Sequence, residues 1–178
     1  MYQPITPISG IAGWRFMQRT QETQFDAFAN SAELNREVEH FKANISSINS
    51  AEALVNDFQL FKVALGAFGL EDKVGDRFFM RKILEEGTEN DGAFALRFTD
   101  TRFREFADAF GFGNAAGSNT GLSDFGAKIS DKYKVLQFEK AVGDSDQSMR
   151  LALTLERDIA ALANIQLSIL ENLWQMLA

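Results

Sequence analysis

Four carboxylates gather around one glycine near the middle of the chain. Glu85 and Glu86 precede Gly87, and Glu89 and Asp91 follow it. Paired carboxylates can act as acid and base in glycoside hydrolysis, and several together can bind a hard cation such as Ca²⁺. No apolar stretch beside this acidic cluster indicates a pocket, so the pattern is more typical of a solvated loop. A small helical enzyme or regulator that acts through the acidic cluster is the alternative function.

His40 is the only histidine in the chain. An imidazole can serve in acid–base catalysis. Here it follows Glu37 and Glu39 on a helical stretch, and no serine or cysteine nucleophile can be assigned to it. One histidine and no cysteine also exclude a histidine-rich or thiolate metal site. We therefore interpret His40 as a surface side chain near carboxylates, and we predict no catalytic residue.

Two further patterns resemble ligand-binding loops but are incomplete. Residues 111–117 read G-x-G-x-x-x-G, yet a helical pattern precedes them, whereas dinucleotide folds place such glycines after a strand. Residues 144–146 begin like a calcium loop, but Met149 and Leu155 stand where glycine and glutamate are needed. We interpret residues 144–146 as a helix cap, and we predict neither a cofactor nor a metal ion.

The composition limits the classes of partner. The chain has 178 residues, no cysteine and a formal net charge of −7. This length favours one domain, and the negative charge argues against binding to nucleic acid or to an anionic membrane surface. Residues 1–10 lack the basic and apolar regions of a signal peptide and read as a loose lead-in. We expect the chain in the cytoplasm when it is synthesised, with export by another route left open.

Residues 56–87 organise the rest of the prediction: a helix, a glycine turn, a short connector and a second helix. Five apolar residues recur with helical spacing, which predicts an amphipathic helix facing a core: Leu54, Phe58, Phe61, Leu65 and Phe68. The second helix is expected to begin after Asp76. Gly69 and Gly87 follow the two helices, where a residue with positive φ commonly ends a helix.

Helical spacing recurs along most of the chain, and alternating β-branched runs are absent. We therefore predict an all-α fold, with residues 1–178 forming a single domain. It should be a bundle of about seven or eight helices that ends in a long helix starting near Gln147. Residues 111–121 are rich in glycine and are predicted to form a flexible loop.

The last helix carries a heptad pattern that suits bundle or coiled-coil packing. Its two heptad positions hold Ala152, Ile159, Gln166 and Leu173, and Leu155, Leu162, Ile169 and Met176. A second apolar set lies off that seam: Ile165, Leu170, Trp174 and Leu177. The chain's own core can cover one side, so we predict that the second set binds a protein partner or a second copy. Scattered amide side chains make this helix too polar to span a membrane.

Three segments carry a family resemblance. They are GWRFMQRTQETQFDAF (13–28), DFQLFKVALGAFGLEDKVGDRFFMRKILEEG (57–87) and FEKAVGDSDQSMRLALTLERDIA (138–160). They resemble the alphaproteobacterial domain-of-unknown-function 1217 family, whose genes often lie in flagellar clusters and whose members include proteins labelled as flagellar basal-body proteins. The family has no established catalytic residues. The resemblance implies a non-enzymatic, flagellum-associated structural or assembly protein that binds protein partners. Members of the family continue past this C-terminus, which leaves open whether the chain is truncated.

Overall fold

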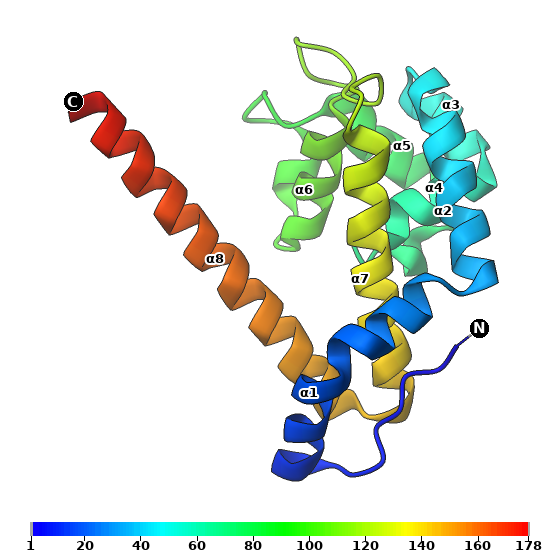
Figure 1. Ribbon diagram of the computed structural model, residues 1–178. Coiled ribbons are helices and arrows are strands. Elements are labelled where there is room, and N and C mark those ends of the chain that lie inside the picture. Colours follow the sequence, from blue (N-terminus) through cyan, green and yellow to red (C-terminus); the bar gives the residue numbers. More distant parts are fainter. Residues whose placement is uncertain (1, 178) are drawn as a thin grey trace. The chain divides into compact units, whose positions relative to one another are not determined.

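The computed structural model describes residues 2–177, and it describes their side chains except at positions 164, 165 and 168–177. This part of the chain contains eight α-helices, three short 3₁₀ helices and no strand (Figure 1). The predicted all-α fold is confirmed. The α-helices are α1 (Gly10–Ala29), α2 (Ala32–Asn44), α3 (Ala51–Asn56), α4 (Phe58–Gly66), α5 (Arg77–Glu86), α6 (Thr101–Phe110), α7 (Phe125–Ser145) and α8 (Gln147–Leu177). The 3₁₀ helices are η1 (Ile45–Ser47), η2 (Glu71–Lys73) and η3 (Phe94–Arg97).

The internal contacts divide the chain into two compact units. Unit 1 contains Ala27–Gln137, and unit 2 contains Gln3–Asp26 together with Phe138–Ala178. Helices α1 and α7 therefore each contribute residues to both units. That the whole chain acts as one domain stays a prediction.

Unit 1 is built from short helices around an aromatic interior. Helix α4 packs against α2 and α3, while α5 packs against α3 and α6. The phenylalanine rings meet mostly edge to face, as between Phe68 and Phe106, whose centroids are 5.3 Å apart. The buried phenylalanines of this unit are Phe28, Phe41, Phe61, Phe68, Phe103, Phe106, Phe110 and Phe125. These rings fill the space between helices that are individually too short to be stable.

The single helix expected across Leu54 to Phe68 is wrong, because Asp57 divides it. Asp57 has extended backbone angles, with φ −89° and ψ 102°. Its Oδ1 accepts hydrogen bonds from the backbone N–H groups of Gln59 and Leu60, both at 3.0 Å. Asp57 thus caps α4, as aspartate commonly does at a helix start. The break turns Phe58 outward, where it is 54% exposed instead of buried.

The glycine-rich loop of residues 111–121 is attached to the loop that follows α5. The Asn114 side-chain oxygen accepts a hydrogen bond from the backbone N–H of Thr88 at 3.3 Å. Glu89 accepts one from the N–H of Ala115 at 2.8 Å. These bonds join segments that are about 26 residues apart in the sequence. The flexibility of this loop stays a prediction.

The positive φ predicted for Gly69 and Gly87 is confirmed, with values of 65° and 63°. Past Gly69, the N–H of Leu70 donates to the carbonyl of Leu65 at 3.0 Å, which is the long bond of a Schellman ending. Gly87 differs because its backbone lies against the glycine-rich loop. A Cβ there would lie 2.5 Å from Asn114 Oδ1 and 2.8 Å from the Gly113 carbonyl carbon.

We expect Gly87→Ala to destabilise the protein more than Gly69→Ala. A Cβ at Gly69 meets nothing closer than 3.6 Å, so only the positive φ opposes it, at about 1 kcal/mol. At Gly87 the overlap with the loop backbone adds to that, for a total of roughly 2–4 kcal/mol. Urea unfolding of the two variants measures the difference. Equal losses would show that the loop yields freely to the new methyl group.

Candidate protein-binding surface

Unit 2 fixes the first two turns of α8. The Asp146 carboxylate accepts hydrogen bonds from the backbone N–H groups of Ser148 at 2.9 Å and Met149 at 3.1 Å. The bond from Met149, followed by one from the Ser9 side chain, holds the pKa of Asp146 below its usual range. The side chains of Met149 and Leu153 are each 3% exposed. The interpretation of residues 144–146 as a cap is confirmed at Asp146, whereas α7 continues through Ser145.

A buried ion pair then fixes the rotation of α8. Glu139 on α7 is 5% exposed, and its two carboxylate oxygens each lie 2.7 Å from Arg157 Nη1. The Thr154 hydroxyl donates to the same carboxylate at 3.0 Å. Burial raises the pKa of Glu139, and Arg157 opposes that rise. Because Thr154 and Arg157 both point to α7, another side of α8 is left for other contacts.

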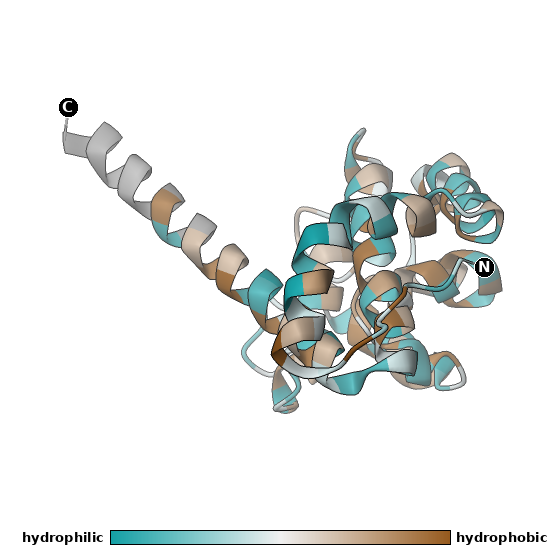
Figure 2. Cartoon of the chain, turned by 60° about the horizontal axis from the view of Figure 1, so that its bottom comes forward, coloured by the Kyte–Doolittle hydropathy of each residue, from teal (hydrophilic) through white to brown (hydrophobic). Residues whose placement is uncertain are grey.

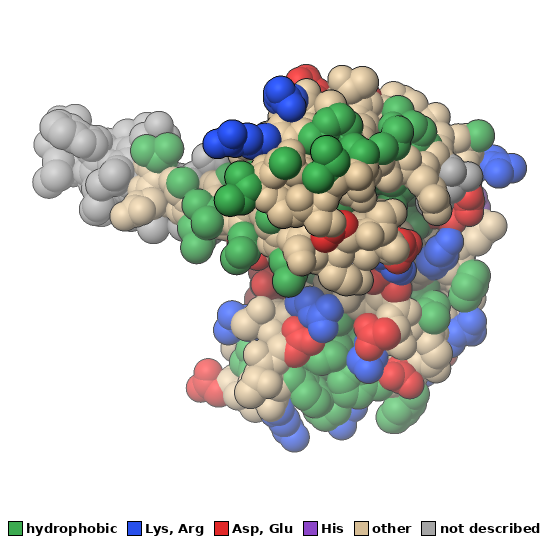
Figure 3. Space-filling view, turned by 90° about the horizontal axis from the view of Figure 1, so that it is seen from below, with side chains coloured by type: hydrophobic (Ala, Val, Ile, Leu, Met, Phe, Trp, Pro, Cys, Tyr) green, Lys and Arg blue, Asp and Glu red, His purple; other side chains and the backbone are tan. Residues whose placement is uncertain are grey.

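That side carries a stripe of large aliphatic residues. Leu151, Leu155, Ile159 and Leu162 follow one another at spacings of four, four and three, so they share one face of the helix. Their exposed fractions are 63%, 61%, 65% and 66%. We call these four residues the α8 stripe. Apolar residues recur along the described part of α8 in Figure 2, and Figure 3 shows their side chains at its surface.

The outcome for the predicted partner-binding residues is divided. Ile165, Leu170, Trp174 and Leu177 lie outside the residues whose side chains the structure describes. The expectation that the chain's core covers the heptad seam is wrong at Leu155, Ile159 and Leu162, which are exposed. The capped and ion-paired side of α8 packs within unit 2 in place of the seam. The heptad spacing in the sequence indicated an apolar stripe on α8, but it did not indicate which side of the helix is exposed.

Three carboxylates of the acidic cluster bind nearby groups of unit 1. Glu85 lies 3.3 Å from Arg81 Nε, and Glu86 accepts a hydrogen bond from the backbone N–H of Phe94 at 2.7 Å. Glu89 binds the glycine-rich loop as described above. Within the described part of the chain, no group of three or more histidine or carboxylate residues is placed to hold a metal ion. These contacts give the carboxylates structural roles.

His40 is half-buried on α2, so its interpretation as a surface side chain is wrong. Its backbone carbonyl accepts a hydrogen bond from the Asn44 side-chain amide at 2.7 Å. Three residues before it, Glu37 takes part in a network that the sequence did not reveal. Tyr133, which is 2% exposed, donates to Glu37 at 2.6 Å, and Lys62 lies 2.5 Å from the same carboxylate. Burial raises the pKa of Tyr133, so it stays a hydrogen-bond donor.

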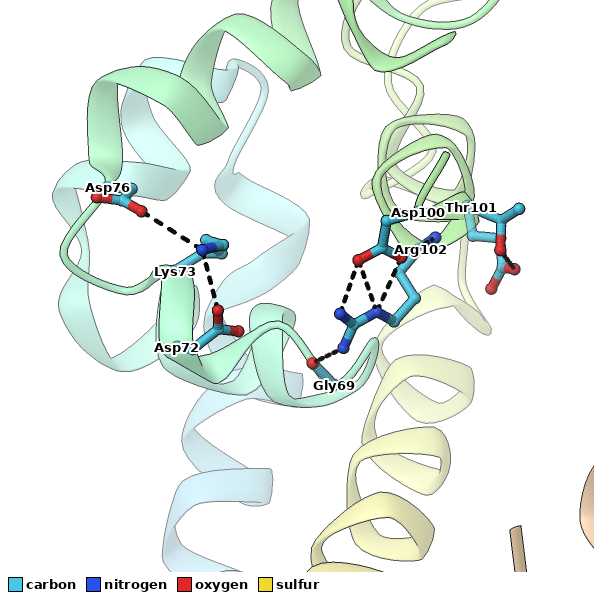
Figure 4. A network of polar contacts seen from close by, with 8 residues as sticks. Gly69, Asp72, Lys73, Asp76, Asp100, Thr101 and Arg102 are labelled. Carbon is cyan, nitrogen blue, oxygen red and sulfur yellow. Dashed lines mark hydrogen bonds and ion pairs between the residues drawn. The ribbon is translucent and has the colours of Figure 1, made fainter. Parts of the chain in front are cut away.

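A second polar network of unit 1 joins the start of α6 to the turn after α4 (Figure 4). Arg102 lies 2.7 Å from Asp100 and donates to the carbonyl of Gly69 at 2.5 Å. The guanidinium holds the pKa of Asp100 below its usual range. Nearby, Lys73 pairs with Asp72 at 3.0 Å. These groups pair with one another, and Arg102 also binds a free carbonyl after the end of α4, so we assign the network a structural role.

Among the residues that the structure describes, no helix has both the length and the apolar character that crossing a membrane requires. Between Leu151 and Leu162, the exposed large apolar side chains of α8 form one stripe, and Glu156, Arg157 and Asp158 interrupt the helix surface around it. The arrangement suits contact with another protein surface, where a core of aliphatic residues is bordered by charges.

We expect Arg157→Met to lower the free energy of unfolding by roughly 2–3 kcal/mol at about pH 7, allowing for the partial exposure of Arg157. Because folding raises the pKa of Glu139, this carboxyl stabilises the fold at pH values below its pKa in the unfolded chain. That stabilisation is lost as the pH rises through its pKa in the folded protein. Loss of Arg157 raises that pKa further. The deficit of the variant should therefore shrink as pH falls toward about 4.

Urea unfolding across this pH range checks the effect. Adding Glu139→Gln to the Arg157→Met variant removes the titrating group and should flatten the pH dependence. A deficit that is constant with pH in Arg157→Met would mean that Glu139 is not the group that Arg157 stabilises.

Comparisons with known proteins place the chain in a family. A family model described as "Protein of unknown function (DUF1217)" matches residues 67–177. Among solved structures, that of protein AGR_C_984 from Agrobacterium tumefaciens is similar, with a TM-score of 0.75, 27% sequence identity and coverage of 87% of this chain and 70% of that chain. A search of curated proteins finds no match. The resemblance seen in the sequence is confirmed: the chain belongs to the DUF1217 family of proteins of unknown function.

Proposed function

We propose that this protein is a non-enzymatic structural or assembly protein of the flagellum that acts by binding other proteins through the α8 stripe. The observation that carries the proposal is the exposure of four large aliphatic side chains, each above 60%, on one face of one helix. Single exposed apolar residues are ordinary, whereas an ordered row of them is typical of an interaction surface.

The stripe is large enough to drive association. Burying one Leu or Ile side chain contributes about 1.5–3 kcal/mol, so four would contribute roughly 6–12 kcal/mol before the entropic cost of association. In unit 1, by contrast, the large apolar side chains that are exposed lie in different elements: Phe58 in α4, Phe78 in α5, and Leu122 before α7. This contrast supports α8 as the binding element.

The flagellar part of the proposal rests on the family. The family model matches residues 67–177, and the resemblance to this family implies genes that lie in flagellar clusters. A protein that joins a flagellar assembly would be made in the cytoplasm and would then bind its partners there or at the flagellar base. The acidic cluster supports no second candidate, because Glu85, Glu86 and Glu89 are engaged in local contacts.

The test uses a strain of the source bacterium from which the gene has been deleted. Complementation with Leu155→Asp combined with Leu162→Asp should fail to restore motility, because two carboxylates in the stripe would have to be buried on binding. Swimming-ring diameter and filament counts by electron microscopy measure the result. A deletion strain with normal filaments and normal motility would contradict the flagellar role.

Leu167→Asp is the matched control. Leu167 is also an exposed aliphatic residue of α8, at 59%, but it lies on a different face from the stripe. It should restore motility as the wild-type chain does. If the stripe variant also restores motility, while the deletion strain is defective, the flagellar role stands and the stripe is not the surface that performs it.

A further inference from the structure

We infer that the peptide bond between Asp91 and Gly92 is a site of spontaneous covalent modification, at which the aspartate converts to isoaspartate. Asp91 is the only aspartate or asparagine of the chain that a glycine follows. Because glycine has no Cβ, its backbone nitrogen can approach the preceding side chain with little steric hindrance. The inference concerns unit 1 and is independent of the function proposed for α8.

Asp91 and Gly92 occupy the two central positions of a β-turn. The N–H of Ala93 donates to the carbonyl of Asn90 at 2.8 Å, and this bond closes the turn. Such a turn uses the N–H of its fourth residue and leaves the N–H of its third residue, here Gly92, without a partner. Across the described part of the chain, no hydrogen bond engages the Gly92 N–H. The nitrogen that must react is therefore free.

The carboxyl group that must react is free as well. Asp91 and Gly92 are both exposed, and no described residue offers the Asp91 carboxylate a hydrogen bond or an ion pair. A Cβ at Gly92 would meet nothing within 4 Å, so the space around this peptide bond is open. Arg97 donates two hydrogen bonds to the Gly92 carbonyl, at 3.1 and 2.8 Å. These bonds hold the peptide after Gly92 and leave the one before it unconstrained.

Aspartates in helices and helix caps lack this freedom. Asp57, Asp100 and Asp146 cap helices, so their carboxylates accept hydrogen bonds from backbone N–H groups further along the chain. Asp131 and Asp144 lie inside α7, where the next backbone N–H belongs to the hydrogen bonds of the helix. Either the carboxylate or the nitrogen is thus engaged at these positions, whereas both are available at Asp91 and Gly92.

The reaction uses only the chain and water. The Gly92 nitrogen attacks the Asp91 side-chain carboxyl carbon and forms a C–N bond, and the carboxyl hydroxyl leaves with the amide proton as water. Water then opens the resulting cyclic imide at either carbonyl. Opening at the side-chain carbonyl restores aspartate. Opening at the main-chain carbonyl leaves the chain running through the former side chain, which is isoaspartate, with mass and charge unchanged.

Isoaspartate would alter the turn in which it forms. It adds one methylene to the main chain between two anchored points. Ala93 is 3% exposed, and the N–H of Phe94 donates to Glu86 at 2.7 Å. The longer chain should therefore weaken the bond from Ala93 to Asn90 that closes the turn. We expect the amide hydrogen of Ala93 to exchange with solvent faster in the modified protein than in the unmodified one.

Incubation of the full chain for several weeks at physiological temperature and neutral pH tests the inference. Peptide mapping with electron-transfer fragmentation distinguishes isoaspartate from aspartate, and isoaspartyl methyltransferase with labelled S-adenosylmethionine detects the new carboxylate independently. Isoaspartate should accumulate at residue 91 at a rate similar to that in the chain unfolded in guanidinium chloride. Asp144 is the internal control, and it should stay unmodified in the folded protein because its neighbour's N–H is engaged.

Gly92→Ala is the matched variant. Gly92 is not among the glycines with positive φ, and a Cβ there meets nothing, so the fold should tolerate alanine. Urea unfolding should show stability equal to that of the wild type or slightly greater. The added methyl group crowds the attacking nitrogen, so isoaspartate at residue 91 should be largely lost.

Three results would overturn the inference. The first is a folded chain that stays unmodified at residue 91 while the unfolded chain reacts there, because the fold would then protect the bond. The second is a Gly92→Ala variant that forms isoaspartate as fast as the wild type. The third is modification of Asp144 at the same rate as Asp91 in the folded chain, because the free Gly92 N–H would then confer no selectivity.

Discussion

The ion pair between Glu139 and Arg157 determines which side of α8 is exposed. A carboxylate that is 5% exposed is costly to bury unless it is paired, so the guanidinium must lie against α7. The Thr154 hydroxyl binds the same carboxylate and excludes a rotation of the helix about its axis. Met149 and Leu153 are buried on this side, and the α8 stripe consequently faces away from it. A buried polar interaction thus sets the position of an apolar surface.

In unit 1, aromatic packing and helix caps stabilise helices that are short. Its α-helices between α2 and α7 have 6 to 10 residues, a length at which isolated helices are unstable in water. Rings of phenylalanine hold them together by edge-to-face contacts, and caps such as Asp57 and Asp100 satisfy their exposed ends. The Tyr133–Glu37–Lys62 network adds one directional contact among α2, α4 and α7.

The fold class could be predicted from the sequence because periodic apolar residues and glycine stops are local signals. These signals predicted that helices stop at Gly69 and Gly87 and that a helix starts after Asp76. The structure has positive φ at both glycines and Asp76 at the N-cap of α5. The break at Asp57 was missed because an apolar stripe continues through it, and only the capping bonds decide that the helix restarts there. The outward side of α8 was also missed. Its orientation depends on the pairing of Glu139 with Arg157 across 18 residues, and helical spacing carries no such information.

An exposed row of leucine and isoleucine has a consequence for the free protein. Collisions between unbound copies would tend toward disordered aggregation as well as toward any ordered complex. The net charge of −7 opposes this, because like-charged chains repel at long range before the stripes can meet. Colloidal stability of the unassembled pool is therefore sensitive to ionic strength and to acidification.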